Sequence, residues 1–153
     1  VIMPQILKEE IKNRIYKAAS KIFYEKGFLK TKMKDISEEA KIPVGLVYTY
    51  YKNKEELFDE IVNPIYYYLN LAIEKEEKEE GSALERFKAT GEEYVLKLLN
   101  QHKSLVILMD KAQGTKHENA KQVFIKILEN HIKRQVQKKG IIIEEEILRI
   151  NFH

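Results

Sequence analysis

The spacing of apolar residues constrains this chain more than any other feature. Apolar side chains recur at separations of three and four along the 153-residue sequence, and no segment alternates with a period of two beyond a few residues. A spacing near 3.6 residues places apolar side chains on one face of an α-helix. The sequence therefore predicts an all-α protein.

Proline, glycine and capping residues mark three helices in the first third of the chain. The first should begin just after Pro4 and end at Gly27. Its buried face should carry Ile11, Ile15, Ala18, Ala19, Ile22 and Phe23. A short second helix should begin after Thr31 as its N-cap, and a third should open at Pro43 and run to about Tyr51. Two short helices joined by a tight turn form a helix-turn-helix.

Longer helices should follow. Asn53 and Glu56 have the spacing of a capping box, which predicts the start of a long helix that contains Pro64. Ser82 and Glu85 repeat that spacing and predict another helix. Its inward face should carry Leu84, Phe87, Gly91, Tyr94, Val95, Leu98 and Leu99.

Three further helices complete the predicted order. A short one should cover residues 105–109, a longer one should carry Ala120 and close at Gly140, and the last should cover residues 144–152. The chain ends inside this last apolar pattern, without a glycine, proline or polar tail. We therefore expect the C-terminal helices to continue past residue 153, lost here by truncation or disorder.

Composition excludes several kinds of protein. The chain has no cysteine, and its four histidines show no ligand spacing, so we expect neither a disulfide nor a metal site, and no cofactor. No apolar run approaches the roughly 20 residues that cross a bilayer, which favours a cytoplasmic protein. There is also no paired carboxylate, activated nucleophile or glycine-rich phosphate loop, so we do not expect an enzyme.

Charge is distributed unevenly. Residues 1–54 carry 12 Lys and Arg against 6 Asp and Glu, whereas residues 55–153 carry 15 against 18. A basic module joined to a mildly acidic one suits a protein whose first part binds the phosphate backbone of a nucleic acid. On charge alone, an ordinary solvated lysine surface is the alternative.

Several motifs agree in register over about residues 6–62. They comprise Gly27-Phe28, Thr31, Asp35-Ile36, Ala40, Gly45, Tyr48, Tyr50-Tyr51, Lys52-Asn53-Lys54 and Leu57. This segment resembles the N-terminal domain of the tetracycline-repressor-like (TetR) family of bacterial transcriptional regulators. The resemblance implies a three-helix DNA-binding domain at residues 1–53. It also implies a helical ligand-binding and dimerisation domain at residues 54–153, with its last helix or helices missing.

Side-chain chemistry supports DNA contact by this segment. Gly45 removes a side chain near the start of the third helix, which allows close approach to DNA. Tyr48 and Tyr50 offer hydroxyl groups to phosphate oxygens, and Lys54 adds a charge at a helix start. Val47 and Tyr51 should instead be buried, because a short helix needs one face in the core.

Other residues of the segment are candidates for base contact. Val44 and Leu46 suit thymine methyl groups, and Thr49 suits a hydrogen bond to a base edge. The resemblance adds Lys34 as a base contact, with Thr31 and Lys32 nearer the backbone. The complete predicted set is Thr31, Lys32, Lys34, Val44, Gly45, Leu46, Tyr48, Thr49, Tyr50 and Lys54. Each lysine or tyrosine taken alone would be an ordinary surface residue.

Aromatic residues of the second domain suggest an apolar effector pocket between helices. The candidates are Tyr68, Phe87, Tyr94, Met109 and Phe124, with His131 as a further one. The alternative is that this stripe belongs to the core, as aromatic residues at helical spacing commonly do.

The predicted function is that of a homodimeric repressor. It would bind a palindromic operator in double-stranded DNA and leave it when a small apolar effector enters the second domain. The alternative is a helical adaptor that keeps the helix-turn-helix but binds another protein. A steep fall of affinity with salt would distinguish DNA binding from this alternative.

Overall fold

The structure is a computed structural model that describes residues 4–78 and 80–139. These residues form eight α-helices and one π-helical turn and contain no strand, which confirms the all-α prediction. In chain order the elements are α1 (Gln5–Lys26), α2 (Met33–Ala40), α3 (Val44–Tyr50), α4 (Lys54–Lys78), α5 (Ala83–Arg86), η1 (Phe87–Gly91), α6 (Glu92–Asn100), α7 (His102–Asp110) and α8 (Ala120–Lys139). None of these helices combines the length and apolar character that crossing a bilayer requires.

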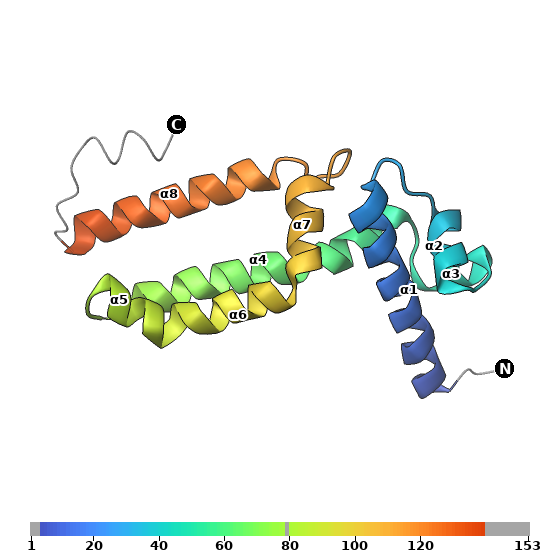
Figure 1. The fold of residues 1–153 in the computed structure, drawn as a ribbon, viewed down its shortest axis with the longest axis horizontal. Coiled ribbons are helices and arrows are strands. Elements are labelled where there is room, and N and C mark those ends of the chain that lie inside the picture. The colour runs from blue at the N-terminus through green and yellow to red at the C-terminus, as the bar shows by residue number, and fades with distance from the viewer. Residues whose placement is uncertain (1–3, 79, 140–153) are drawn as a thin grey trace.

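The molecule is elongated, with α1, α2 and α3 gathered at one end (Figure 1). Helix α4 starts at that end and runs along the molecule, and α6 returns beside it. Helix α7 lies across α4 and also contacts α1, and α8 then runs back along the length. The long helix α4 therefore belongs to both parts of the chain.

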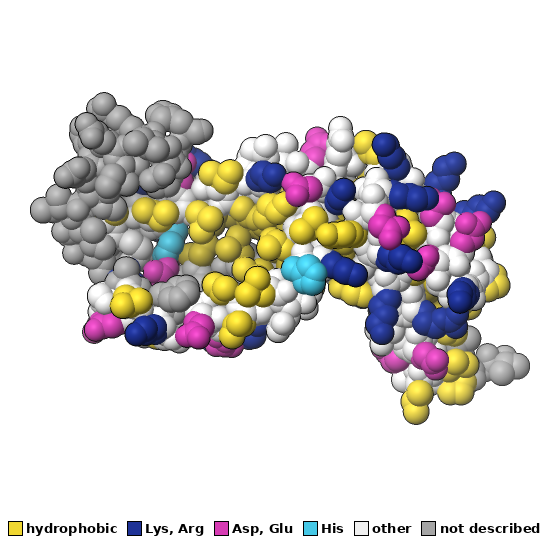
Figure 2. All heavy atoms as spheres, in the orientation of Figure 1, with side chains coloured by type: hydrophobic (Ala, Val, Ile, Leu, Met, Phe, Trp, Pro, Cys, Tyr) yellow, Lys and Arg dark blue, Asp and Glu magenta, His cyan; other side chains and the backbone are white. Residues whose placement is uncertain are grey.

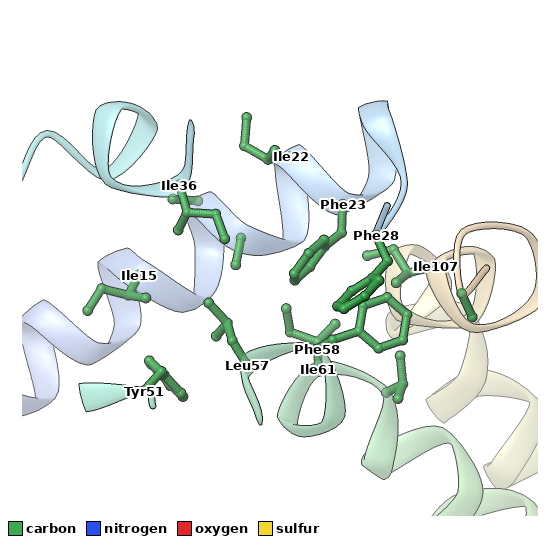
Figure 3. Close-up of a cluster of buried hydrophobic side chains, with 14 of the residues drawn as sticks. Ile15, Ile22, Phe23, Phe28, Ile36, Tyr51, Leu57, Phe58, Ile61 and Ile107 are labelled. Atoms are coloured by element: carbon green, nitrogen blue, oxygen red, sulfur yellow. The ribbon is translucent and has the colours of Figure 1, made fainter. Parts of the chain in front are cut away.

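The N-terminal core is built around three phenylalanine rings (Figure 3). Phe58 packs edge-on against Phe23 and Phe28, with ring centroids 5.2 and 5.4 Å apart. All six residues predicted for the buried face of α1 are buried. Ile107 of α7 joins this cluster, so the N-terminal helices pack directly against a later helix of the chain.

Helix α2 begins one residue later than predicted. Its N-cap is Lys32, whose backbone N–H donates to the Asp35 carboxylate at 2.9 Å. Thr31 lies in the preceding turn and donates its hydroxyl to the Gly27 carbonyl oxygen at 2.7 Å. The Asp35 carboxylate satisfies the N–H of Lys32, and the Thr31 hydroxyl, already bonded to Gly27, does not cap the helix.

Half of the capping box predicted before α4 is present. The Asn53 side-chain oxygen accepts the Glu56 N–H at 2.9 Å, as expected. The Glu56 carboxylate, however, accepts the N–H of Lys52 and not that of Asn53. Helix α4 then continues through Pro64.

The helix predicted after Ser82 is present but interrupted. Its capping box is confirmed, since Ser82 and Glu85 exchange backbone-to-side-chain hydrogen bonds at 3.0 and 3.2 Å. The π-helical turn η1 then separates α5 from α6 and shifts the helical register. The prediction that one continuous stripe faces inward is therefore wrong: Tyr94 is buried, but Leu84, Val95 and Leu99 are exposed. The helix predicted at residues 144–152 lies outside the described residues.

Candidate nucleic-acid interface

Helix α3 has one buried and one exposed face. Val47 is fully buried and holds the helix against the core, which confirms its predicted place, as does the burial of Tyr51. Val44 and Thr49 are exposed on the other face, and the Tyr48 side chain is 51% exposed. The exposed face thus combines a methyl-bearing side chain with two hydroxyl groups.

Gly45 lies on this face, and neither its surroundings nor its backbone conformation requires glycine. A Cβ atom added there would meet no other atom of the described chain within 4 Å. Its φ is not in the left-handed region either, so the backbone would accept another residue. Gly45 therefore leaves open space on the exposed face of α3.

Two predicted contacts of α3 lie at the edge of the exposed face. Leu46 and Tyr50 are half-buried and pack against the hydrophobic core. Thr49 is exposed, and its hydroxyl donates to the Gly45 carbonyl oxygen at 3.1 Å, which leaves its oxygen free to accept.

The structure corrects the prediction for Thr31. Its side chain is only 1% exposed and its hydroxyl is already bonded to Gly27. A buried, satisfied hydroxyl supports the turn and offers no group to DNA. The exposed residue at this end of α2 is its neighbour Lys32.

A groove of about 340 Å³ lies between the α1–α2 turn, α3 and the start of α4. Tyr48, Lys32 and Lys54 line it. The Lys54 ammonium donates to the carbonyl oxygens of Phe28 and Thr31 at 2.8 and 3.0 Å. Lys54 is therefore held in place by the fold, whereas Lys32 is open to solvent.

Lysine and arginine side chains gather over this end of the molecule (Figure 2). Lys34 on α2 is 78% exposed, and its ion pair with Glu38 is long, at 3.9 Å. Exposed pairs of this kind contribute little to stability and break easily. Lys34 therefore remains available to a phosphate or a base.

A second candidate site is a cavity of about 390 Å³ formed by α4, η1, α6 and α8. Its walls are Leu69, Ala72, Ile73, Glu76, Gly91, Tyr94, Val95, Leu98, Leu128 and His131. Figure 2 shows hydrophobic side chains gathered in a hollow where α8 faces α4 and α6. Tyr94 and His131 are the predicted candidates that line the cavity.

The other predicted pocket residues lie elsewhere. Phe124 is buried against Tyr66, with ring centroids 5.2 Å apart, and Met109 packs on the main core. Tyr68 is half-buried outside the cavity, 5.7 Å from the Lys97 ammonium. The Phe87 side chain lies outside the described residues. Phe124 and Met109 therefore belong to the hydrophobic core, which was the alternative to a place in the pocket.

The sequence did not predict a role for two carboxylates near one end of the cavity, those of Glu76 and Glu77. His131 contacts Glu76 through Nε2 and Glu77 through Nδ1, the latter at 3.1 Å. Arg134 binds Glu77 at 2.7 Å, and together Arg134 and His131 lower the pKa of the Glu77 carboxyl. Glu76 and Glu77 belong to an acidic run that resembles a solvated helix end, so no sequence signal distinguishes them.

A polar junction between the two parts of the chain was also missed. His117, in the loop before α8, contacts the Asp59 carboxylate at 2.6 Å and the Tyr66 hydroxyl at 2.9 Å. Its ring stacks on Phe58, with centroids 6.0 Å apart. The sequence separations of 58 and 51 residues give no local pattern to detect.

Known proteins resemble the N-terminal region in sequence. The family model for bacterial regulatory proteins of the tetR family matches residues 15–61. An uncharacterized HTH-type transcriptional regulator of Bacillus subtilis, YhgD, is 46% identical over 50 residues, which are 33% of this chain and 26% of that protein. The HTH-type transcriptional regulator HbdR of an Aromatoleum species is 37% identical over 57 residues, 37% of this chain and 25% of that protein. The matches thus span only about a quarter of these relatives.

Solved structures resemble a larger part of the chain. NalD, the secondary repressor of the MexAB-OprM multidrug efflux pump in Pseudomonas aeruginosa, is 28% identical, with a TM-score of 0.55. That alignment covers 82% of this chain and 70% of NalD. MexZ, another Pseudomonas aeruginosa repressor, shares the fold, with a TM-score of 0.60 at 21% identity over 88% of this chain and 72% of MexZ. Residues 15–61 of this chain therefore match the family model for bacterial regulatory proteins of the tetR family, and the chain shares its fold with repressors such as NalD and MexZ.

Proposed function

We propose that this chain is a transcriptional repressor that binds a palindromic DNA operator as a homodimer and is released by a small apolar effector. The observation that carries the proposal is the exposed face of α3. There an open glycine, Gly45, lies between Val44 and Tyr48. Two exposed lysines lie nearby in the helix-turn-helix, Lys32 at the N-cap of α2 and Lys34 within α2. A helix with this face suits the major groove of DNA.

Each exposed group has a role in this proposal. Tyr48 and Lys32 bind phosphate oxygens and fix the register of α3. Val44 contacts a thymine methyl group, Thr49 accepts a hydrogen bond at a base edge, and Lys34 reaches the groove from α2. Leu46 and Tyr50 contribute from the edge of this face. Lys54 acts on the same groove from its fixed position.

Homodimer formation is supported by apolar side chains that the described chain leaves exposed on α6 and α8. These residues are Val95, Leu96, Leu99, Val123, Ile125 and Ile132. Large apolar side chains left exposed on a helix are candidates for burial in a protein interface. Two copies related by a two-fold axis would present two α3 helices to successive half-sites of a palindrome.

The cavity behind α4 supports control by an effector. Leu57 and Phe58, near the start of α4, belong to the core that holds the DNA-binding domain, and Leu69, further along the same helix, lines the cavity. A ligand that shifts α4 would move one α3 relative to the other. A 100-fold loss of DNA affinity requires about 2.7 kcal/mol of coupling.

The test is a DNA-binding titration. Bound sequences are first selected from a random pool, and the affinity of the selected sequence is then measured for wild type and for Tyr48→Phe. Loss of one phosphate hydrogen bond of about 1 kcal/mol should weaken binding about fivefold. Tyr67→Phe is the matched control, because Tyr67 is also an exposed tyrosine but lies on α4.

Salt dependence completes the test. Wild-type affinity should fall steeply with salt, since several lysines would displace counterions from DNA. An affinity independent of salt, or equal weakening by the two tyrosine substitutions, would count against the proposal.

A further inference from the structure

A groove of about 560 Å³ lies between α1, the end of α2 and the start of α7. Figure 2 shows lysine and arginine side chains along α1 on the side turned to the viewer. None of the residues proposed to contact DNA, all of which the structure describes, lines this groove. Its charged lining consists of one carboxylate, that of Glu39, and the cations Arg14, Lys17, Lys21, Lys41 and Lys103.

Only part of this positive charge is balanced within the protein. The Glu39 carboxylate contacts the Lys21 ammonium at 2.8 Å. Lys17, Lys41 and Lys103 are exposed and form no ion pair within the described part of the chain. With five cations and one anion, the lining has an excess of four positive charges. Cations gathered in one groove repel one another, and an anion that enters the groove relieves this repulsion.

The end of α2 holds Arg14 in place. One nitrogen of its guanidinium group, Nη2, donates to the carbonyl oxygens of Ala40 and Lys41 at 2.6 and 3.3 Å. A guanidinium group has five N–H groups, so those on Nε and Nη1 remain for a ligand. Lys17 and Lys21 follow Arg14 at spacings of three and four residues, which places all three on one face of α1. Helix α1 therefore supplies three of the five cations from one side of the groove.

Lys41 has a backbone conformation that does not favour lysine. Its φ is 58°, and it is the one non-glycine residue of the described chain with a positive φ. Glycine adopts this left-handed region most easily, because it has no Cβ atom. A glycine would therefore suit the turn after α2 better. What lysine adds at this position is its side chain, which carries one of the unpaired charges of the groove.

We infer that this groove binds a small anion that carries at least two phosphate groups. A phosphate group has a charge of about −1.5 to −2 near pH 7, so two such groups match the excess of four positive charges. Ammonium and guanidinium groups are strong donors to phosphate oxygens, and the hydroxyl groups of Tyr16 and Ser20, which also line the groove, can donate as well. The volume lies within the usual range of small-molecule sites. This site goes beyond the proposed function, because it lies neither on α3 nor in the apolar cavity.

The phosphate backbone of DNA has the same chemistry as such a ligand. DNA bound to the exposed face of α3 would, however, have to extend past the helix-turn-helix to reach Lys103 on α7. A small anion can meet α1, the turn after α2 and α7 together, because all three line one groove. The structure therefore favours a free ligand, and DNA is the alternative source of phosphate that the test must separate.

The first test compares two anions. Inorganic pyrophosphate and orthophosphate are titrated calorimetrically into the full wild-type chain without DNA, in metal-free buffer at fixed ionic strength, since salt screens exposed charges. Pyrophosphate should saturate a single site per chain. It should bind at least about tenfold more tightly than orthophosphate, because it supplies a second phosphate group. Equal affinities for the two anions, or no saturable binding of pyrophosphate, would overturn the inference.

Lys41→Gly locates the site with little risk to the fold, because glycine accepts a positive φ more readily than lysine. This variant should bind pyrophosphate at least about threefold more weakly than wild type. Lys103→Ala should weaken binding in the same way from α7, and it decides the matter should Lys41→Gly not fold, as circular dichroism would show. The matched control is Lys88→Ala, since Lys88 is an exposed lysine of η1 outside the groove. Wild-type affinity in Lys41→Gly and Lys103→Ala, or equal weakening by Lys88→Ala, would overturn the assignment.

DNA titrations separate the two sources of phosphate. A site for a free ligand predicts that Lys17→Ala and Lys103→Ala weaken pyrophosphate binding and keep the affinity for the selected DNA. Weaker DNA binding by these variants with unchanged pyrophosphate binding would assign the groove to the DNA backbone and overturn the inference. Pyrophosphate binding is measured without DNA, so a failure of operator binding leaves it standing and counts against the repressor alone.

Discussion

Lys54 and Phe28 are joined in two ways: the ammonium donates a hydrogen bond to the Phe28 carbonyl oxygen at 2.8 Å and lies 4.1 Å from the centroid of the Phe28 ring. A further hydrogen bond reaches the carbonyl oxygen of Thr31 at 3.0 Å. These contacts fasten the start of α4 to the turn between α1 and α2. Since an ammonium has three N–H groups, one remains for a phosphate.

Lys54→Ala should therefore lower stability as well as DNA affinity. Two charge-assisted hydrogen bonds at a half-buried position are expected to contribute about 1–2 kcal/mol to the free energy of unfolding. Urea unfolding and a DNA titration measure the two effects. The control is Lys32→Ala, which should weaken DNA binding at every sequence and leave stability unchanged, because Lys32 is exposed. Unchanged stability in Lys54→Ala would contradict the structural role of this lysine.

Gly45→Ala separates folding from DNA approach. The added methyl group meets nothing within the described chain, and alanine favours a helix by about 1 kcal/mol over glycine. The variant should unfold at equal or higher urea concentration but bind the selected DNA at least about tenfold more weakly, because the methyl group would meet the DNA surface. Full DNA affinity in a stabilised variant would show that α3 does not approach DNA at Gly45.

Local signals explain why the first domain could be predicted from the sequence. Gly27 ends α1 with a φ of 78°, and the Asn53 side chain caps α4. On α1 and α3, the spacing of apolar residues within the helix is enough to separate the residues that face the core from those that face solvent. Val47 and Tyr51 could be assigned to the core because a seven-residue helix must bury one face.

The predictions that failed concern features without a distinctive local sequence pattern. Thr31 has the residue type of a cap, yet α2 begins one residue later and the Thr31 hydroxyl donates to Gly27. The π-helical turn has no sequence signature in this chain, and it moves Val95 and Leu99 out of the predicted face. For the cavity, the residues that give it chemistry, Glu76 and His131, are 55 residues apart in the sequence. Only the packing of α8 along α4 brings them together.

The contacts of His117 predict a variant that affects control but not DNA binding. Tyr66→Phe removes the hydroxyl that contacts His117 Nδ1 and leaves the ring that packs on Phe124. It should lower the free energy of unfolding by about 1 kcal/mol and keep DNA affinity, because no DNA-facing residue changes.

The same substitution should reduce the effect of a bound effector. Phe58 and Tyr66 of α4 both contact His117, so this junction links the DNA-binding core to the loop before α8. The measurement is the ratio of DNA affinities with and without a saturating ligand, compared between wild type and Tyr66→Phe. An identical ratio would show that coupling does not depend on this hydrogen bond. Tyr67→Phe again serves as the control.

Asp35 predicts how the stability of the DNA-binding domain depends on pH. The hydrogen bond from the Lys32 N–H, aided by the charge of Lys26, lowers the pKa of the Asp35 carboxyl below its ordinary value. A group with a lowered pKa in the folded state stabilises the fold above its unfolded pKa, which is about 3.9 for an aspartate. That contribution is lost as the pH falls through the lower, folded pKa.

Asp35→Asn should therefore reduce the free energy of unfolding near pH 7 by about 0.5–1 kcal/mol, the usual contribution of a charge at a helix N-terminus. The difference from wild type should begin to shrink as the pH falls below about 4 and should disappear below the lower pKa of the folded state, where the carboxyl is protonated in both states. Urea unfolding between pH 3 and pH 7 measures it, with Asp110→Asn as the control at an exposed aspartate outside α2. A difference that stays constant over this range would mean that the Asp35 charge does not stabilise α2.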